Sequence, residues 1–307
     1  MSVPQEKILV IKLGALGDFI ISLGAMRAIK KHHPNAHITL LTTKPFKQFA
    51  RQSSYCDDIW IDERPKFFQP LKLLNLRKKL NSGKFQRVYD LQNNDRTSLY
   101  FKLFSPKPEW VGAAKGASHY YDDPARTVGL PLEGLKLLLN NAGVDEIEID
   151  AMDWIQADIT PFNLRNPYAL IVPGSAPSRP EKRWPKEKYA MLCQMLAAND
   201  IQPVLLGTKD EQDITHYISK ECNDALNLTA KTSLFDIITL GRHANYAIGN
   251  DTGPMHMIAP TGCKTLTIFS QYSNPIRNAP SGKNTYTIQI DNFDNLNPKQ
   301  VFDKLLS

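Results

Sequence analysis

Apolar residues come in short runs along the first half of the chain, and amphipathic stretches lie between the first of these runs. Runs of this kind are typical of buried strands, and we expect strands at 7–12, 37–42, 58–61 and 88–91. We expect helices between them at 18–31 and 45–53. Strands and helices in alternation predict a parallel sheet with helices on both faces.

A second series of the same kind fills the second half. We expect its strands at 168–172, 203–207, 246–250 and 264–269, and its helices at 186–198, 211–222, 233–241 and 255–259. After Asp145 the sequence becomes acidic and irregular, and Pro161 and Pro167 interrupt it, which predicts a linker. The sequence therefore predicts an α/β fold of two Rossmann-like domains, residues 1–160 and 161–307, whose sheets face a cleft.

Length and composition agree with this organisation, since 307 residues with 42% hydrophobic and 22% charged residues suit two globular domains. Lys12 and Asp18 interrupt the first apolar run, so it is not a secretory signal, and no stretch approaches the roughly 20 apolar residues of a membrane span. The four cysteines lie far apart, at Cys56, Cys193, Cys222 and Cys263. Because this spacing suits neither a metal knuckle nor a disulfide framework, we expect reduced thiols and a cytoplasmic protein.

The net charge of +6 and the pI near 9.0 imply an anionic partner. The stretch from Arg64 to Arg87 contains no acidic residue and eight basic ones: Arg64, Lys66, Lys72, Arg77, Lys78, Lys79, Lys84 and Arg87. Apolar residues such as Phe67 and Leu71 are interleaved with them. Such a stretch suits contact with an anionic bilayer, or an ordinary amphipathic helix with solvated lysines. Nucleic acid fits less well, because no known nucleic-acid-binding motif accompanies the charge.

An apolar strand expected at 246–250 runs into Asp251-Thr252-Gly253 and then a short helical pattern. The glycine lets a ligand approach the backbone closely, and the first amides of a helix favour anions. The turn therefore suits a nucleotide diphosphate. The alternative is an ordinary connection between a strand and a helix.

The turn after the first strand holds Gly14, Gly17 and Asp18 at the carboxyl end of the sheet, where open α/β sheets bind ligands. It is not the dinucleotide fingerprint, because the pattern Gly-x-Gly-x-x-Gly is missing. Asp18 has two interpretations. It caps the following helix, or it is displayed as a general base.

The loop at 173–185 is long, and three of its residues are basic. Loops of this kind are often functional, and Arg179, Lys182 and Arg183 are suited to phosphate. The alternative is a solvated charge cluster on the surface. The strand at 203–207 is expected to end at the same sheet edge.

The residues after that strand offer two further possibilities. Glu211 or Asp210 is suited to accept hydrogen bonds from ribose hydroxyls, or Thr208 or Asp210 caps the next helix.

Three of these segments, taken in order, resemble glycosyltransferase family 9, the ADP-heptose:lipopolysaccharide heptosyltransferases. They are residues 8–12 with Gly17-Asp18, the loop 174–185 with Lys182-Arg183-Trp184-Pro185, and residues 251–256. The resemblance covers nearly the whole chain. It implies a GT-B fold, inversion at the anomeric carbon, and neither a metal nor a cofactor.

The resemblance also implies roles for individual residues. Asp18 corresponds to the proposed catalytic base, Lys182 to the lysine that neutralises the donor diphosphate, and Glu211 to the acid that binds ribose. Thr252 and Gly253 correspond to the turn that binds the diphosphate. Further donor-binding residues are expected to be Ser175, Arg179, Asp251 and His256, of which Asp251 orients the turn or contacts the sugar. Acceptor-binding residues are expected to be Gly17, Asn93, Asp95 and Arg96.

The partners implied are a nucleotide-sugar donor, ADP-heptose, and a lipid-linked saccharide acceptor of the lipopolysaccharide core, with contact to the inner membrane through residues 64–87. Gly14-Ala15-Leu16 and Pro254-Met255 depart from the usual family pattern, which leaves the sugar and the acceptor open. Two alternatives share the fold or the ligand: a nucleotide-sugar epimerase or hydrolase, and a non-catalytic nucleotide-binding protein.

Overall fold

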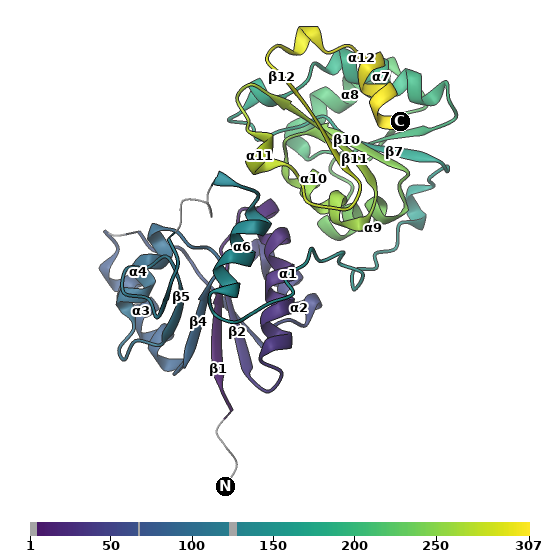
Figure 1. Ribbon diagram of the computed structural model, residues 1–307. Coiled ribbons are helices and arrows are strands. Elements are labelled where there is room, and N and C mark those ends of the chain that lie inside the picture. Colours follow the sequence, from purple (N-terminus) through teal and green to yellow (C-terminus); the bar gives the residue numbers. More distant parts are fainter. Residues whose placement is uncertain (1–4, 67, 123–127) are drawn as a thin grey trace. The chain divides into compact units, whose positions relative to one another are not determined.

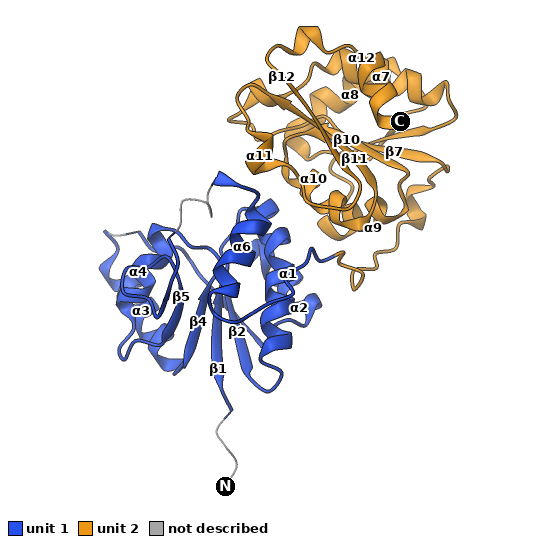
Figure 2. Ribbon diagram, viewed as in Figure 1, with its two compact units in different colours: residues 1–150 blue, residues 151–307 orange. Residues whose placement is uncertain are grey.

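Strands and helices alternate through both halves of the computed structural model (Figure 1). The structure describes residues 5–66, 68–122 and 128–307, so Phe67 of the basic stretch lies outside the described residues. The chain divides into two compact units, 1–150 and 151–307, which we call the first and the second unit (Figure 2).

The first unit contains a sheet of six parallel strands in the order β3-β2-β1-β4-β5-β6. Their bounds are β1 (Lys7–Ile11), β2 (His37–Thr42), β3 (Asp58–Ile61), β4 (Arg87–Asp90), β5 (Glu109–Gly112) and β6 (His119–Tyr120). At the end of β1, Ile11 pairs with Leu41 of β2 on one side and with Asp90 of β4 on the other. The carboxyl ends of β1 and β4 therefore lie side by side.

Helices connect these strands: α1 (Leu16–His32), α2 (Lys47–Ser53), α3 (Pro70–Ser82), α4 (Asp95–Leu103) and α6 (Pro131–Asn140). In this unit α6 packs against α1, and α3 against α4. Gly24 lets α1 lie directly on the backbone of 148–150, since a Cβ atom there would be 1.8 Å from the carbonyl oxygen of Glu148. This contact fastens the end of the first unit to its own core.

The second unit repeats the topology, with six parallel strands in the order β12-β11-β10-β7-β8-β9. Their bounds are β7 (Tyr168–Val172), β8 (Gln202–Leu205), β9 (Leu226–Asn227), β10 (Tyr246–Asn250), β11 (Lys264–Ser270) and β12 (Thr285–Ile290). The helices are α7 (Lys186–Ala197), α8 (Gln212–Glu221), α9 (Leu234–His243), α10 (Gly253–Ile258), α11 (Pro275–Asn278) and α12 (Pro298–Leu306). Both units thus have the strand order of a Rossmann-like sheet.

The boundary between the units falls after Asp150, where we had expected it after residue 160. Residues 151–160 pack on the second unit because Arg242 of α9 donates to the carbonyl oxygens of Met152 at 2.8 Å and Ile155 at 2.7 Å. The amide of Ala157 donates to the Thr239 hydroxyl at 3.0 Å. Within the described residues, no helix has the length and apolar character needed to cross a membrane.

Candidate active site

In each sheet the strand order reverses at one place. The chain adds strands toward one edge of the sheet, returns to the middle, and then adds strands toward the other edge. These switch points lie between β1 and β4 in the first unit and between β7 and β10 in the second. In open α/β sheets, ligands bind beyond the carboxyl ends of the strands at this place. The predicted site residues follow these four strands or their neighbours, so the topology gathers them into one group in each unit.

In the second unit, Asn250 at the end of β10 holds both ends of the loop that follows β7. Its side-chain amide donates to the carbonyl oxygens of Pro173 at 2.7 Å and Gly174 at 3.2 Å. Its side-chain oxygen accepts from the Trp184 amide and the Tyr189 hydroxyl, both at 3.0 Å. Asn250 is fully buried, so these bonds are shielded from water and fix the loop on the sheet edge.

Within the loop, Arg183 and Ser175 are joined by hydrogen bonds. Arg183 donates to the Ser175 hydroxyl at 3.2 Å and to its carbonyl oxygen at 3.0 Å, and the Ser175 hydroxyl donates to the Arg179 carbonyl oxygen at 2.9 Å. Arg179 forms an ion pair with Glu181 at 2.6 Å and donates to the carbonyl oxygen of Tyr272 at 3.2 Å. Arg183 and Ser175 therefore shape the loop, and Arg179 lies exposed on it.

Lys182 lies on the same loop and reaches across to the end of β10. Its ammonium group contacts the Asp251 carboxylate at 2.7 Å, and both side chains are largely buried. The hydroxyl of Ser273, in the turn after β11, donates to the same carboxylate oxygen. Three segments that are distant in sequence thus fix one cation at the switch point. Asp251 therefore orients this lysine, whereas the sequence predicts that it orients the turn or contacts the sugar.

Asp251-Thr252-Gly253 forms the turn from β10 into α10, as predicted. Thr252 is the N-cap, with extended backbone and no side-chain capping bond. Gly253 is the first helical residue. The second, Pro254, has no N–H, and the amide of the third, Met255, donates back to the Thr252 carbonyl oxygen at 3.2 Å. Of the first three positions of this helix, Gly253 has the amide left for a ligand. His256 is half-buried on the same short helix.

Glu211 lies at this sheet edge too, beyond β8. Thr208 caps the following turn, which confirms one of the two interpretations of these residues. Glu211 completes the capping box by accepting hydrogen bonds of 2.8 Å from the Thr208 amide and 2.6 Å from the Thr208 hydroxyl. The second carboxylate oxygen faces Gly174, where an added Cβ atom would lie 3.0 Å from it. One oxygen of Glu211 is therefore structural, and the other faces the loop that carries Lys182.

In the first unit, Asp18 is the third residue of α1, and its side chain is exposed. The capping interpretation of Asp18 is wrong, because the helix begins at Leu16 and its N-cap is Ala15. Gly17 precedes it within the first helical turn. Asp18 is thus displayed at the carboxyl end of β1, where a general base would stand.

Lys12 and Asp90 form a buried charged group at the switch point of the first unit. The Lys12 ammonium donates to the Leu91 carbonyl oxygen at 3.1 Å, and Asp90 accepts from the amides of Asn93 at 2.8 Å and Gln92 at 3.2 Å. Burial lowers the pKa of Lys12, while the charges of Asp18 and Asp90 act in the opposite direction. Burial likewise raises the pKa of Asp90 to about 6.

Leu13, in the turn between β1 and α1, is hydrogen-bonded to residues of three neighbouring turns. The Leu13 amide donates to the Gln92 side chain at 2.9 Å, and its carbonyl oxygen accepts from the Thr43 hydroxyl at 3.1 Å and from Arg64. The turns after β1, β2, β3 and β4 are thereby joined. Arg64 belongs to the basic stretch, and its side chain takes part in this hydrogen-bond network.

The remaining predicted acceptor residues lie at the same edge. Asn93 accepts from the Ala113 amide at 2.6 Å, and Arg96 donates to the Pro65 carbonyl oxygen at 3.0 Å. Asp95 is exposed at the start of α4. Asn93 and Arg96 thus connect neighbouring loops, and their contact with an acceptor stays a prediction.

Comparison with known proteins identifies relatives of this chain. Lipopolysaccharide heptosyltransferase 1 of Campylobacter coli is 23% identical over 93% of this chain and 88% of its own length. The model of glycosyltransferase family 9 (heptosyltransferase) matches residues 136–304, more than half of the chain. The chain belongs to glycosyltransferase family 9.

Two solved structures show how far the fold of this family 9 protein extends. The glycosyl transferase family 9 structure from Veillonella parvula DSM 2008 superposes with a TM-score of 0.83 at 19% identity, covering 97% of this chain and 95% of that one. E. coli ADP-heptose lps heptosyltransferase II gives a TM-score of 0.74 at 20% identity, covering 97% of both chains. The family and the GT-B fold implied by the three sequence segments are therefore confirmed, and the chain is a glycosyltransferase.

Three residues that build the candidate site were missed from the sequence: Asn250, Ser273 and Arg64. Their partners lie far away in sequence, so no local pattern marks them. A signal from position existed for Asn250, because it ends a buried strand at a switch point. The segment that begins at Asp90 follows a strand in the same way, which is the reason to expect it near the acceptor.

Proposed function

We propose that this family 9 enzyme moves a heptose from ADP-heptose to a saccharide acceptor of the lipopolysaccharide core, with inversion at the anomeric carbon. The observation that carries the proposal is Lys182, fixed by Asp251 and Ser273 at the switch point of the second unit. The names of the Campylobacter and E. coli proteins support heptose as the sugar and ADP as the nucleotide.

On the donor side, the bond between the anomeric carbon and the diphosphate oxygen breaks, and the departing ADP takes the electron pair. Lys182 would face the growing negative charge, and the Gly253 amide would add a second donor. Preorganised charge of this kind is often the largest contribution to catalysis. The free oxygen of Glu211 would accept a hydrogen bond from ribose.

On the acceptor side, Asp18 would take the proton of the attacking hydroxyl, whose oxygen then forms the new bond to the anomeric carbon. Its exposure suits this role, because a general base must reach the proton that it removes. Lys12, buried at the end of β1, interacts electrostatically with Asp18. Gly17, Asn93, Asp95 and Arg96 would contact the acceptor saccharide.

Lys182 would do the electrostatic work that a cation performs in metal-dependent transferases, so we propose a reaction without a metal. Since the acceptor would be lipid-linked, the proposed location is the cytoplasm, at the inner face of the inner membrane.

The test is incubation of the purified chain with ADP-heptose and a heptose-deficient core acceptor, with and without EDTA. We expect the acceptor to gain the mass of one heptose in both samples, with an anomeric configuration opposite to that of the donor. Loss of activity in EDTA would refute the metal-free reaction, and retained configuration would refute inversion. Consumption of ADP-heptose without acceptor would indicate an epimerase or hydrolase, and binding without turnover a non-catalytic protein.

A further inference from the structure

Helix α3 carries apolar side chains on two different faces. Leu76 and Leu80 point inward and belong to the core of the first unit. Leu71 and Leu74 are 76% and 51% exposed, and Phe68, just before the helix, is 75% exposed. Residues three or four apart lie on one face of a helix, so Leu71, Leu74 and Lys78 form a single outward row. We call Phe68, Leu71, Leu74 and Lys78 the α3 surface.

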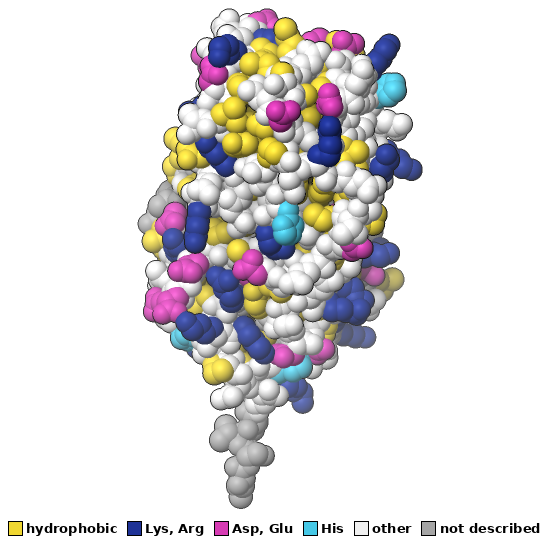
Figure 3. All heavy atoms as spheres, turned by 90° about the vertical axis from the view of Figure 1, so that its right-hand side faces the viewer, with side chains coloured by type: hydrophobic (Ala, Val, Ile, Leu, Met, Phe, Trp, Pro, Cys, Tyr) yellow, Lys and Arg dark blue, Asp and Glu magenta, His cyan; other side chains and the backbone are white. Residues whose placement is uncertain are grey.

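The segment that carries the α3 surface contains charges of one sign, because all charged residues from Arg64 to Arg87 are basic. Asp62 and Glu63 precede this segment, and of these two only Glu63 is exposed. On the face of the molecule in Figure 3, by contrast, basic and acidic side chains are interspersed. The Lys66 ammonium lies 5.5 Å from the centre of the Phe68 ring, so one cation is directly next to the most prominent aromatic group. Exposed leucines among uncompensated lysines favour an anionic, partly apolar partner.

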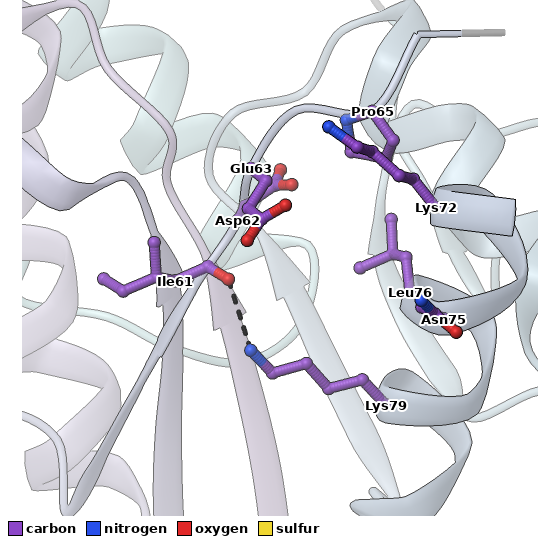
Figure 4. A pocket seen from close by; sticks show the side chains of 8 residues that line it. All are labelled: Ile61, Asp62, Glu63, Pro65, Lys72, Asn75, Leu76 and Lys79. Atoms are coloured by element: carbon purple, nitrogen blue, oxygen red, sulfur yellow. Dashed lines mark hydrogen bonds between the residues drawn. The ribbon is translucent and has the colours of Figure 1, made fainter. Parts of the chain in front are cut away.

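A second group of cations lies on the flank of α3. Lys72 and Lys79, with Asn75, project from the helix into a pocket of about 200 Å³ whose other side is formed by Ile61, Asp62, Glu63 and Pro65 (Figure 4). Lys79 is bound to the Ile61 carbonyl oxygen at 3.2 Å and lies over the Trp60 ring. Lys72 is exposed at the rim. It is therefore available to a phosphate next to the α3 surface.

We propose that the α3 surface docks on an anionic phospholipid bilayer. Phe68, Leu71 and Leu74 enter the boundary between headgroups and acyl chains, while Lys72 and Lys78 bind lipid phosphates. Amphipathic helices with basic flanks bind membranes in this way, through buried apolar area and attraction to anionic lipid. The inference rests on the proposed function, because docking would bring the enzyme to a lipid-linked acceptor. The docking itself can be tested without measuring catalysis.

The test is flotation of the full chain with vesicles of phosphatidylglycerol and phosphatidylethanolamine, and with vesicles of phosphatidylcholine alone. We expect binding to the anionic vesicles that weakens as salt is added. The double variant Leu71→Gln/Leu74→Gln should lower the partition coefficient about tenfold through lost apolar burial. Lys72→Gln/Lys78→Gln should lower it roughly 25-fold, about fivefold for each cation near an anionic surface.

Matched controls lie on helices of the second unit. Met191 and Ile276 of the second unit are 55% and 67% exposed, so Met191→Gln/Ile276→Gln removes similar apolar area. Lys220→Gln/Lys304→Gln removes two exposed charges on α8 and α12. Both controls should float like the unaltered chain.

Equal flotation with both kinds of vesicle would overturn the proposal, as would α3 variants that bind like their controls. Thermal unfolding of each variant checks its fold, and the lysine pair decides the matter if the leucine pair does not fold. Transfer to a delipidated, water-soluble acceptor separates the two hypotheses. If no transfer occurs but flotation depends on the α3 surface, the proposed function fails and the docking stands.

Discussion

At the scale of single residues, the proposed donor site contains a pair of opposite charges, Lys182 and Asp251. An isolated Asp251 carboxylate would repel a diphosphate. In the structure it holds the Lys182 ammonium at 2.7 Å and also accepts from Ser273. An arriving diphosphate would find a lysine whose position is already set, and the Ser273 hydroxyl would continue to satisfy the aspartate.

The pair leads to a coupling prediction. Lys182→Ala should lower kcat roughly 10²-fold, on the scale of losing one charge-stabilising group. Asp251→Asn should also lower kcat, and the double variant should be little worse than Lys182→Ala, because both changes remove the same positioned cation. Steady-state kinetics over the four proteins measure this. Lys299→Ala, which breaks an exposed Lys–Asp pair in the same unit, is the control. Fully additive effects would contradict the pairing.

Asp18 gives the second prediction at this scale. Asp18→Asn removes the base and keeps the shape of the side chain, so turnover should fall by roughly 10² or more with little change in donor affinity. The matched control is Asp213→Asn, an exposed acid in the first turn of α8. Near-normal turnover of Asp18→Asn on its acceptor would remove Asp18 from this role.

Asp90 gives a prediction about pH. Burial raises the pKa of Asp90 from 3.8 to about 6 in the folded protein, so ionising this carboxyl group lowers the unfolding free energy. This loss of stability is absent below pH 3.8 and is complete above pH 6. Asp90→Asn removes this cost. The unfolding free energy of the unaltered chain relative to the variant should therefore fall by about 2 kcal/mol between about pH 4.5 and 7.5. Urea titration monitored by tryptophan fluorescence measures it, and a difference that does not vary with pH would refute the shift.

Sequence patterns could identify Asp18 and Lys182 because each stands in a short, recognisable segment. They could not reveal what those residues contact. Asn250 bonds to Pro173 and Gly174, and Leu13 to Gln92, over separations of more than seventy residues. Such bonds follow from the strand order of the sheet, which the local pattern leaves undetermined.

At the scale of elements, runs of apolar residues predicted some strands and missed others. The bounds expected for β2, β3, β7 and β10 agree with the structure, and each of these strands contains at least three apolar residues. Burial did not decide the outcome, because β3, with no buried residue, was predicted and β5, buried at three of its four positions, was not. Edge strands β6 and β9 have two residues each, and β12 is largely exposed, so their patterns are too short or too polar to recognise. α12 was missed despite its capping box at Asn297.

The connection between β10 and the loop after β7 can be tested by one substitution. Asn250→Ala removes four buried hydrogen bonds, so we expect a loss of about 3 kcal/mol in the unfolding free energy and a raised KM for the donor. Asn245→Ala, at the other end of β10, removes one bond, to the Tyr168 amide, and is the control. Equal effects of the two changes would contradict the special role of Asn250.

At the scale of the whole molecule, each unit has its own complete sheet and its own switch point. All residues of the proposed donor site lie in the second unit. We therefore expect residues 151–307, produced alone, to fold and to bind ADP. A ligand at about 100 times its Kd stabilises a protein by about 2.7 kcal/mol, which a thermal shift assay detects readily. The fragment 1–150 is the control. Stabilisation of that fragment in its place would reverse the assignment of donor and acceptor.

The central claim is sugar transfer from a nucleotide to an acceptor. Its most direct test is the rate of ADP release from ADP-heptose, measured with and without the heptose-deficient core acceptor. We predict release that depends on the acceptor and equals the heptose gained by it. Release at the same rate without acceptor, or no release in its presence, would contradict the account.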